Sequence, residues 1–421
     1  MYNMDPIISR AMTNQNTFNK VGKVRKLCFN VSYLNDDQVL IETSDRLSAN
    51  DQSLGKILGK GQILNQIGQW WFEHCPIKNH FQYASSPTSW ICTKVDPIPL
   101  EFIVRQYLYG SMWQNYQNGQ RTFWGLTLED NMTCGQELPE ILVTPTTKET
   151  ELGKHDRPIT KKEVIDEGIL NSNQYDKCIE LSKKIFGWGS LVCKQHGLVL
   201  VDTKYEFGLK DNEILLIDEL HTPDSSRFWK HPFNEPLESE FGFVVEKFDK
   251  DVARNYLKNN PDITDLPEHI KDQLMYGYTN VYEHILRQKF NNLNDSFMIT
   301  IIAGSIKDSD HCKKIIKEIE NSSLSWQLYY GSAHKNTNNV LNYLNNLSGK
   351  NIIITVAGAS NALSGVVACN CKYPVFACPP FKDKIDMMVN INSTLQMPSK
   401  VPVMTVLNIE NLILCINRIL G

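Results

Sequence analysis

The feature that most constrains the fold is a regular alternation of apolar and helix-like segments that begins at Phe297. The apolar segments read FMITIIAGS, WQLYY, NIIITVAG and YPVFACPP, and each has the length and composition of a buried strand. Segments near 308–320 and 338–347 have helical patterns. Because parallel strands are joined by helical crossovers, this alternation predicts a doubly wound parallel α/β sheet with helices on both faces.

Chain length and the irregular spacing of the earlier strand-like segments predict another domain before this one. The chain has 421 residues, which is more than one ordinary hydrophobic core organises. Strand-like segments between 18 and 290 are separated by irregular intervals and long polar loops, and the junction NNLNDS is polar and turn-rich. We therefore predict a polar tail at 1–17, a first domain at 18–290, a linker at 291–296 and a second domain at 297–421.

Composition excludes several classes of partner. The net charge is -4 and the pI about 6.2, so no bulk positive field attracts nucleic acid or an anionic membrane. No apolar run approaches the ~18 residues of a membrane span, and the N-terminus lacks the apolar stretch of a secretory signal. Eleven cysteines without a CxxC pair are typical of a reducing compartment. We predict a cytoplasmic protein with neither nucleic-acid nor membrane partners.

A basic, glycine-containing segment near the N-terminus is the first candidate phosphate site. In NKVGKVRKLCF, Gly22 lies among Lys23, Arg25 and other cations. Glycine allows the backbone to approach a phosphate closely, and basic side chains neutralise it. A basic surface hairpin is the commoner explanation of such a run, so this signal alone is weak.

An arginine within an apolar strand-like segment indicates an anion site. The segment PLEFIVRQYLYGSMW carries Arg105 and ends in a turn that contains Ser111. Arginine is rarely buried without a partner, and its guanidinium binds carboxylate or phosphate in a fork. We therefore predict that this segment binds an anionic substrate.

The densest group of charges lies between 199 and 227. In VLVDTKYEFGL, alternation places Asp202, Lys204 and Glu206 on one face of a strand. A second apolar strand, ILLI, is followed directly by Asp218. Carboxylates on two adjacent strands suit Mg²⁺, and a lysine among them balances the charge of a polyphosphate. The alternative is a hairpin with a solvated acidic face.

The order of these motifs resembles that in SAICAR synthetases. GKVR, ETSDRLSANDQ, PLEFIVR, TPTTKETELGKHD, VDTKYEFG, IDELHTPDSSRFW and FDKDVARNYL cover roughly 18–290. The resemblance implies a small β-rich lobe and a larger α/β lobe with ATP between them. It also implies condensation of CAIR with L-aspartate, driven by ATP with Mg²⁺ through an acyl phosphate. Lys26 departs from the family pattern, in which an acidic residue is frequent.

The same resemblance implies roles for individual residues of the first domain. Gly22, Lys23 and Arg25 would contact the ATP phosphates. Glu206 and Asp218 would bind Mg²⁺ and ATP, with Asp218 and Lys204 acting in catalysis. The CAIR ligands would be Arg105, Ser111 and Arg227, and a loop over the site would contain Lys148, His155 and Asp156.

In the second domain, polar residues follow three successive strands. Ser305 precedes a helix whose N-terminus can bind phosphate, while Asp308 is equally well explained as a helix N-cap. Ser332, His334 and Lys335 follow the next strand, and VAGASNALSG follows the third. Such loops converge at one edge of a parallel sheet. His334 is the strongest acid–base candidate because imidazole exchanges a proton near neutral pH.

These loops resemble those of AIR carboxylases over about 297–421. The matching motifs are GS--D, SAHK, AG-SNALSG and YPV--CPP, and they look like the animal-type class that uses CO2 directly. The resemblance implies a flavodoxin-like fold, a homo-octamer and the reaction of AIR with CO2 to CAIR. His334 would move the ring proton, with Lys335 as the other catalytic residue. The AIR and CO2 ligands would be Ser305, Asp308, Ser332, Gly358, Ser360 and Asn361.

Both domains together predict a bifunctional enzyme of purine biosynthesis, since CAIR made by the second domain is the substrate of the first. Lys307 and Ala359 depart from the carboxylase pattern. They leave open an alternative in which the chain is a SAICAR synthetase whose inactive carboxylase-like domain serves oligomerisation. A kinase-like nucleotide-binding or scaffold protein is a third hypothesis, and it predicts no aspartate-dependent release of ADP.

Overall fold

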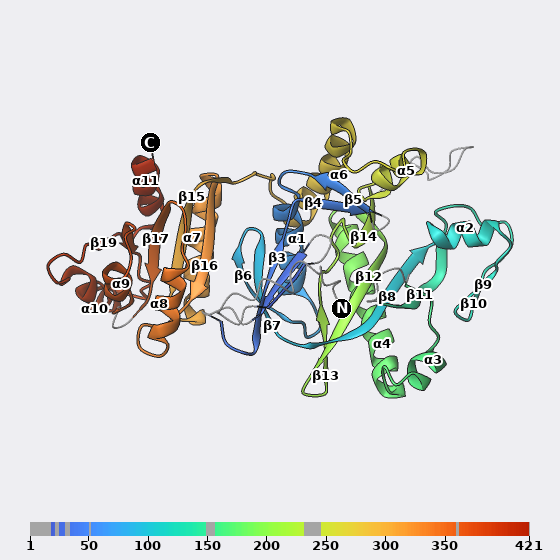
Figure 1. Cartoon of the computed structure of the whole chain (residues 1–421), viewed down its shortest axis with the longest axis horizontal. Helices are drawn as coiled ribbons and strands as arrows, with labels where there is room; N and C mark the ends of the chain where they lie inside the picture. Colours follow the sequence, from blue (N-terminus) through green and yellow to red (C-terminus); the bar gives the residue numbers. More distant parts are fainter. Residues whose placement is uncertain are drawn as a thin grey trace.

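The computed structural model describes residues 18–21, 25–29, 34–49, 52–148, 156–230, 246–358 and 362–420, with backbone alone for 18–21, 25–29 and 294–296. The described elements form an N-terminal region (β1–α6) and a C-terminal region (β15–α11), which lie side by side along the longest axis (Figure 1). Within these ranges, no helix combines the length and apolar character that a membrane crossing requires.

The N-terminal region begins with an antiparallel sheet of order β1-β2-β3-β7-β6, a two-stranded hairpin β4-β5 and helix α1. Helix α1 buries Ile63, Ile67 and Trp71 against this sheet and the rest of the core. The bounds are β1 Phe18–Val21, β2 Arg25–Phe29, β3 Gln38–Thr43, β4 Arg46–Ala49, β5 Gln52–Lys56, α1 Lys60–His74, β6 Phe81–Ser86 and β7 Ser89–Thr93.

A second antiparallel sheet of order β11-β8-β12-β13, with β14 paired to β12, forms the larger part of this region. Helix α4 covers β12 and β8, while α2 and a small hairpin form a satellite with its own apolar cluster. The bounds are β8 Asp96–Tyr107, α2 Ser111–Gln117, β9 Thr122–Phe123, β10 Leu126–Thr127, β11 Glu137–Thr147, α3 Lys161–Asp166, α4 Ser172–Gln195, β12 Leu198–Lys210, β13 Glu213–Ile217, β14 Ser226–Lys230, α5 Asp251–Asn259 and α6 Glu268–Leu286.

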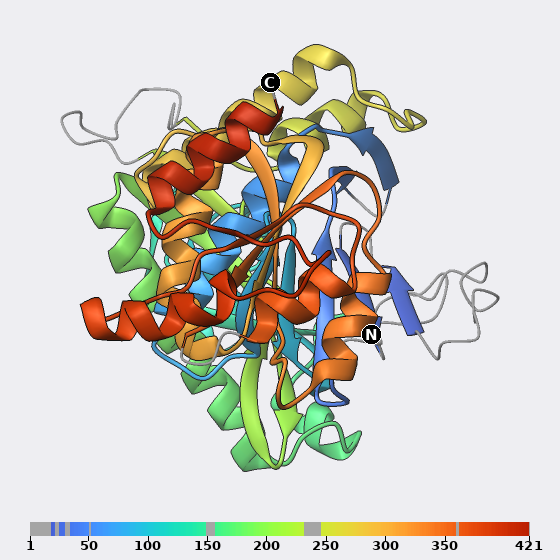
Figure 2. The same cartoon turned by 90° about the vertical axis from the view of Figure 1, so that its left-hand side faces the viewer.

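The C-terminal region is a parallel sheet of order β16-β15-β17-β18-β19, which confirms the doubly wound prediction. Helices α7 and α11 pack together, and α9 packs with both α8 and α10; in Figure 2 this region lies nearest the viewer. The bounds are β15 Asn294–Ala303, a 3-10 turn Ile306–Asp308, α7 Ser309–Asn321, β16 Leu324–Tyr330, α8 Thr337–Asn345, β17 Asn351–Val356, α9 Ala362–Cys369, β18 Val375–Ala377, α10 Lys384–Leu395, β19 Met404–Thr405 and α11 Ile409–Leu420.

Strand β15 begins earlier than the apolar pattern indicates. It starts at Asn294 rather than at Phe297, because Asn294 pairs with Leu324 before an irregularity that resets the register at Met298. Backbone pairing of this kind does not require apolar side chains, so hydrophobicity cannot locate it.

The two regions meet through the edges of their sheets. Strand β6 ends one sheet and β16 ends another, and the two strands lie next to each other (Figure 1). The rings of Tyr83 and Tyr330 make an edge-to-face contact with centroids 4.7 Å apart. Each edge strand is thereby covered by the other region, which removes a surface prone to pairing with other chains.

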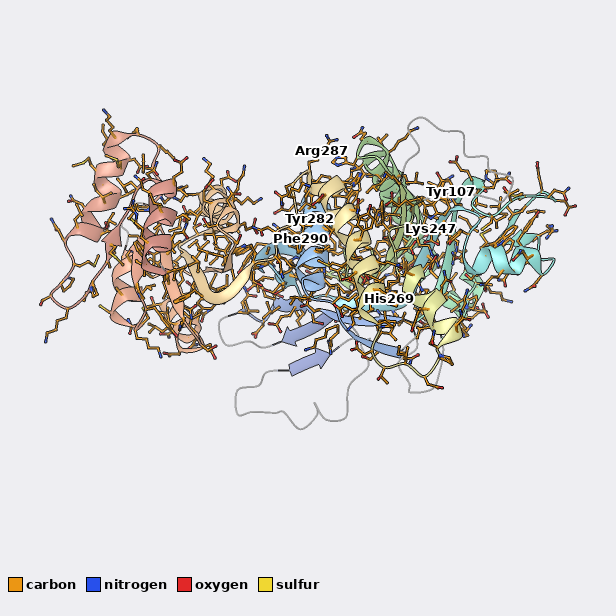
Figure 3. The ribbon with its side chains drawn as sticks, turned by 90° about the horizontal axis from the view of Figure 1, so that it is seen from above. Tyr107, Lys247, His269, Tyr282, Arg287 and Phe290 are labelled. Carbon is orange, nitrogen blue, oxygen red and sulfur yellow. The ribbon has the colours of Figure 1, made fainter. Side chains whose placement is uncertain are left out.

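The connection between the regions folds back onto helices of the first. Figure 3 shows Tyr282 of α6 next to Phe290, and their rings are 5.3 Å apart. Gln62 of α1 donates to the Asn291 carbonyl (2.9 Å) and accepts from the Leu293 amide (3.3 Å). These contacts hold the connection against α1 rather than leaving it as an open tether.

The carboxyl group of Glu320 at this junction is hydrogen-bonded to residues of both regions, and its ionisation should affect the stability of the chain. Glu320 Oε1 accepts from Gln66 Nε2 (2.9 Å) and Trp326 Nε1 (3.0 Å), and burial raises the pKa of Glu320. The folded state therefore holds its proton to higher pH than the unfolded state, so stability falls as pH rises through the raised value. Glu320→Gln keeps the acceptor oxygen but cannot ionise, so it removes this pH-dependent loss of stability.

We expect the melting temperature of Glu320→Gln, relative to the original chain, to increase from pH 4 to pH 8. Differential scanning calorimetry across this range measures the difference. The matched control is Glu410→Gln, a change at an exposed residue of the same region. A constant difference between variant and parent at all pH values would contradict this expectation.

Candidate active sites

The first site is built on the pairing of β8 with β12. In this antiparallel register, Arg105 lies opposite Asp202 and Glu101 lies opposite Glu206. Alternation along both strands then places these four residues, with Lys204, on one face of the sheet. The charges that the sequence predicted on one face of β12 are therefore matched by charges on β8.

Two arginines converge on Asp202. Its Oδ2 accepts from Arg105 Nη1 (3.1 Å) and from Arg227 Nη1 (2.5 Å). Arg105 Nη2 also donates to Ser111 Oγ (3.4 Å). The three predicted CAIR ligands are thus brought together, around a carboxylate to which the sequence had assigned no role. Guanidinium groups bind carboxylate or phosphate in a fork, so the two arginines suit an anionic ligand.

Gly110 makes room for this cluster. Its φ is 61°, a conformation that favours glycine, and an ideal Cβ there would lie 3.1 Å from both terminal nitrogens of Arg227. A side chain at this position would therefore push the guanidinium away from Asp202.

Two further aspartates, which the sequence interpretation missed, lie beside Arg227. Arg227 Nε is 3.3 Å from Asp251 Oδ2. Burial, followed by the charge of Asp251, raises the pKa of Asp249 to about 7. Its Oδ2 is buried without a hydrogen-bond partner among the described residues. The sequence motif FDKD contains both aspartates and could have pointed to them, but it contributed only to the resemblance to SAICAR synthetases.

Next to the arginine cluster on the same face of β8 and β12, lysines alternate with glutamates in a second charged cluster. Lys204 Nζ contacts Glu101 Oε1 (2.6 Å) and Glu206 Oε1 (3.2 Å), and Lys148 Nζ contacts Glu206 Oε2 (2.5 Å). Burial alone would lower the pKa of Lys204, but the charges of Glu206, Glu101 and Asp218 raise it well above its ordinary value. Lys204 therefore stays charged among these carboxylates.

Asp218 directly follows β13, and Glu206 pairs with Ile217 one residue earlier. Burial, followed by the charge of Asp218, raises the pKa of Glu206. Two carboxylates that disfavour each other's charge would both be stabilised by a cation. In the described part of the chain, no group of three or more His, Cys, Asp or Glu residues is placed to hold a metal. The pair alone would supply two carboxylates, and Mg²⁺ in proteins commonly takes its other ligands from water and phosphates.

A buried ion cluster supports the start of α1. Asp224 Oδ2 contacts Lys60 Nζ (2.8 Å) and Lys250 Nζ (2.9 Å), and Tyr278 Oη donates to Asp224 Oδ1 (2.8 Å). Burial, the largest cause, lowers the pKa of Lys60 to about 8. The sequence patterns assigned no role to Lys60 or Asp224, so this cluster was not foreseen.

Several predicted residues of the first site are not described. Gly22, Lys23 and His155 lie outside the described residues, and Arg25 is described only by its backbone, on β2. Asp156 is exposed at the start of the next described segment.

The second site lies at the carboxyl ends of β15, β16 and β17. The Gly331 amide donates to the Ala303 carbonyl and the Gly304 amide donates to the Val356 carbonyl, both at 2.8 Å. The loops that follow these strands therefore start side by side. Gly358 follows β17, whereas Ser360 and Asn361 lie outside the described residues.

A serine fixes the turn that carries His334. Ser332 Oγ accepts from the amides of His334 and Lys335, both at 3.3 Å. His334 and Lys335 are exposed, and Ser332 is half-buried. Because the backbone is held by Ser332, the imidazole projects from a defined position at the sheet edge.

Asp308 occupies the N-cap position of α7, but its side chain makes no capping hydrogen bond, so the cap interpretation is wrong for its carboxylate. Ser305 Oγ accepts instead, from the Lys307 amide (3.2 Å). Burial raises the pKa of Asp308. A pocket of about 500 Å³ beside it is lined by Lys307, His311 and Phe381 among others. His334 does not line this pocket.

The fold and sites define a class of protein: an antiparallel α+β domain with a charged strand face, fused to a doubly wound domain with a histidine at its strand ends. The family model for SAICAR synthetase matches residues 19–268, and that for AIR carboxylase matches residues 298–421. The chain belongs to the SAICAR synthetase family and carries an AIR carboxylase region behind it. It thus joins a ligase and a lyase of purine biosynthesis, which favours the bifunctional prediction over the kinase-like and scaffold hypotheses.

Similar proteins cover about two thirds of the chain. A phosphoribosylaminoimidazole-succinocarboxamide synthase of Legionella pneumophila is 38% identical over an alignment of 283 residues, and the match covers 64% of this chain and 88% of the relative. The structure of SAICAR synthase from Saccharomyces cerevisiae complexed with SAICAR is 27% identical, with a TM-score of 0.55, over 69% of this chain and 98% of that one. A type-2 SAICAR synthetase in complex with ADP is 27% identical, with a TM-score of 0.50, over 65% and 99%.

Proposed function

We propose that the C-terminal region carboxylates AIR with CO2 to give CAIR, and that the N-terminal region joins CAIR to L-aspartate at the expense of ATP. The product of the second step is SAICAR. The observation that carries this proposal is the adjacency on β8 and β12 of an arginine-rich cluster and a lysine–carboxylate cluster. The first suits an anionic substrate, and the second suits a metal–polyphosphate.

The ligase step needs charge neutralisation more than a protein nucleophile. A carboxylate is a poor electrophile, so transfer of a phosphoryl group from ATP to the CAIR carboxylate creates an acyl phosphate that the aspartate amine attacks. Mg²⁺, held by Glu206 and Asp218, would supply positive charge at the phosphates. Lys204 and Lys148 would stabilise the transferred charge from the neighbouring strands, with Gly22, Lys23 and Arg25 at the ATP phosphates.

Arg105, Ser111 and Arg227 would hold the phosphate and carboxylate of CAIR. Asp202, which accepts from both arginines, would keep their guanidinium planes oriented. We expect Arg227→Lys to raise the KM for CAIR by about 10- to 100-fold, because a point charge replaces a fork of charged hydrogen bonds. Steady-state kinetics with CAIR as the varied substrate measures this.

Arg121→Lys is the matched control for this experiment. Arg121 contacts Asp130, an exposed carboxylate on the satellite of α2, rather than the cluster around Asp202. An unchanged KM in Arg227→Lys would remove this arginine from the CAIR site.

In the carboxylase, His334 would take the proton from the ring carbon of AIR as that carbon attacks CO2. Lys335, Ser332 and Asn361 would bind CO2 or the new carboxylate. The ribose phosphate of AIR would lie on the residues at the first and third strand ends, Ser305, Asp308, Gly358 and Ser360. Support comes from the turn that Ser332 fixes and from the adjacency of the three loops.

We also propose a cytoplasmic homo-octamer assembled through the C-terminal region. Helix α10 exposes a row of large apolar side chains, with Ile385 78%, Met388 58% and Val389 57% accessible. An apolar face of this kind is costly in water and is typical of a subunit contact. Sedimentation of the purified chain measures the assembly.

One reconstitution separates the proposal from its alternatives. The full chain is supplied with AIR, bicarbonate, ATP, Mg²⁺ and L-aspartate, and SAICAR is detected by mass. AIR with bicarbonate and no ATP isolates the carboxylase, and CAIR with ATP and aspartate isolates the ligase. Formation of SAICAR from CAIR but not from AIR would favour the inactive-carboxylase alternative.

A further inference from the structure

The loop between β13 and β14 is held in an unfavourable conformation. Asp218 has a φ of 67° and His221 a φ of 46°, so two non-glycine residues within four positions adopt left-handed geometry. Such a conformation costs free energy and persists only where the surroundings fix it. Because Asp218 is one of the two carboxylates proposed for Mg²⁺, the anchor of this loop determines where that carboxylate lies.

The anchor is the side chain of His221, which is fully buried. Its Nε2 lies 2.5 Å from the hydroxyl of Tyr205, and its ring meets Trp71 edge-on with centroids 4.6 Å apart. An ideal Cβ at Gly189 would be 2.2 Å from the imidazole Cε1. The ring is therefore held between α1, α4 and β12, and glycine at 189 leaves room for it.

Tyr205 links this anchor to the other carboxylate. It lies between Lys204 and Glu206 on β12, so its side chain points to the opposite face from theirs and into the core. The hydrogen bond to His221 thus joins the Asp218 loop to the short stretch of strand that carries Glu206. The same stretch is paired with β13 through Glu206 and Ile217.

Burial lowers the pKa of His221 to about 3, so the imidazole is neutral under ordinary conditions. A neutral imidazole therefore adds no charge near the carboxylates of Asp218 and Glu206. A purely apolar ring would fill the same space, but it would not form the hydrogen bond to Tyr205. The polar contact therefore gives the buried hydroxyl of Tyr205 a hydrogen-bond partner and ties it to the Asp218 loop.

We propose that His221 is a positioning residue whose hydrogen bond to Tyr205 fixes the position of the Asp218 loop relative to Glu206, and so supports the binding of one Mg²⁺ by both carboxylates. This inference rests on the proposed function of the two carboxylates. Residues that orient metal ligands through a second layer of contacts typically change metal affinity about 10- to 100-fold when removed.

Calorimetric titration of the full chain with ADP, with and without Mg²⁺, tests this inference. We expect Mg²⁺ to tighten ADP binding in the parent chain. In His221→Phe and Tyr205→Phe, this tightening should fall by about tenfold while the metal-free affinity stays unchanged. The double variant should be no weaker than either single variant, because both remove one interaction. His221→Gln, whose side-chain amide can still form a hydrogen bond with the Tyr205 hydroxyl, should restore most of the tightening.

Different results overturn different parts of the proposal. If Asp218→Asn retains the Mg²⁺-dependent tightening, the metal assignment and the inference both fall. If Asp218→Asn loses it but His221→Phe and Tyr205→Phe keep it, the inference alone falls, and His221 serves packing only. Tyr205→Phe, which removes a single oxygen, decides the question if His221→Phe does not fold.

Discussion

Asp218→Asn is expected to lower the rate of SAICAR formation from CAIR by about 10²- to 10³-fold, while AIR carboxylation by the same chain continues at its original rate. The reason is that Asp218 and Glu206 together would hold the cation that neutralises the transferred phosphoryl group. Burial, followed by the charge of Asp218, raises the pKa of Glu206, so a cation between the two carboxylates would stabilise the charged form of Glu206.

Separate assays on one protein preparation measure both rates. ADP release from CAIR, ATP and aspartate reports the ligase, and CAIR formation from AIR and bicarbonate reports the carboxylase. The matched control is Asp262→Asn, which changes an exposed carboxylate of the same region. Equal ligase rates in Asp218→Asn and Asp262→Asn would remove Asp218 from the metal site.

His334→Asn is expected to produce the reverse pattern. Loss of a general acid–base group typically costs about 10²- to 10⁴-fold, so CAIR formation from AIR should fall by that factor. The ligase, supplied with CAIR, should be unaffected. Ser332 accepts from the backbone amides at 334 and 335, so the turn itself should survive the change.

The control for this experiment is His269→Asn, an exposed histidine on α6 that Figure 3 shows in the N-terminal region. Neither activity should change in it. Together, Asp218→Asn and His334→Asn would each serve as the folding control for the other, since each leaves one activity of the chain intact. Retained carboxylation in His334→Asn would transfer the acid–base role to another group.

Local sequence determined those features that depend on neighbours a few residues apart. Period-two alternation placed Asp202, Lys204 and Glu206 on one face of β12, and alternating strands and helices gave the parallel sheet. Apolar runs located β16, β17 and β18 closely. Each of these patterns is short-range, because side-chain direction in a strand or helix follows from the backbone repeat.

The tertiary structure alone decided which of these faces meet. Arg105 and Asp202 are 97 positions apart, Lys60 and Asp224 are 164 apart, and Gln66 and Glu320 are 254 apart. A single sequence carries no periodic signal across such separations, so the partner of each charge, the role of Glu101 and the junction of β6 with β16 could not be inferred. Charges in a low-dielectric interior require partners, but only the folded packing specifies which partner each one finds.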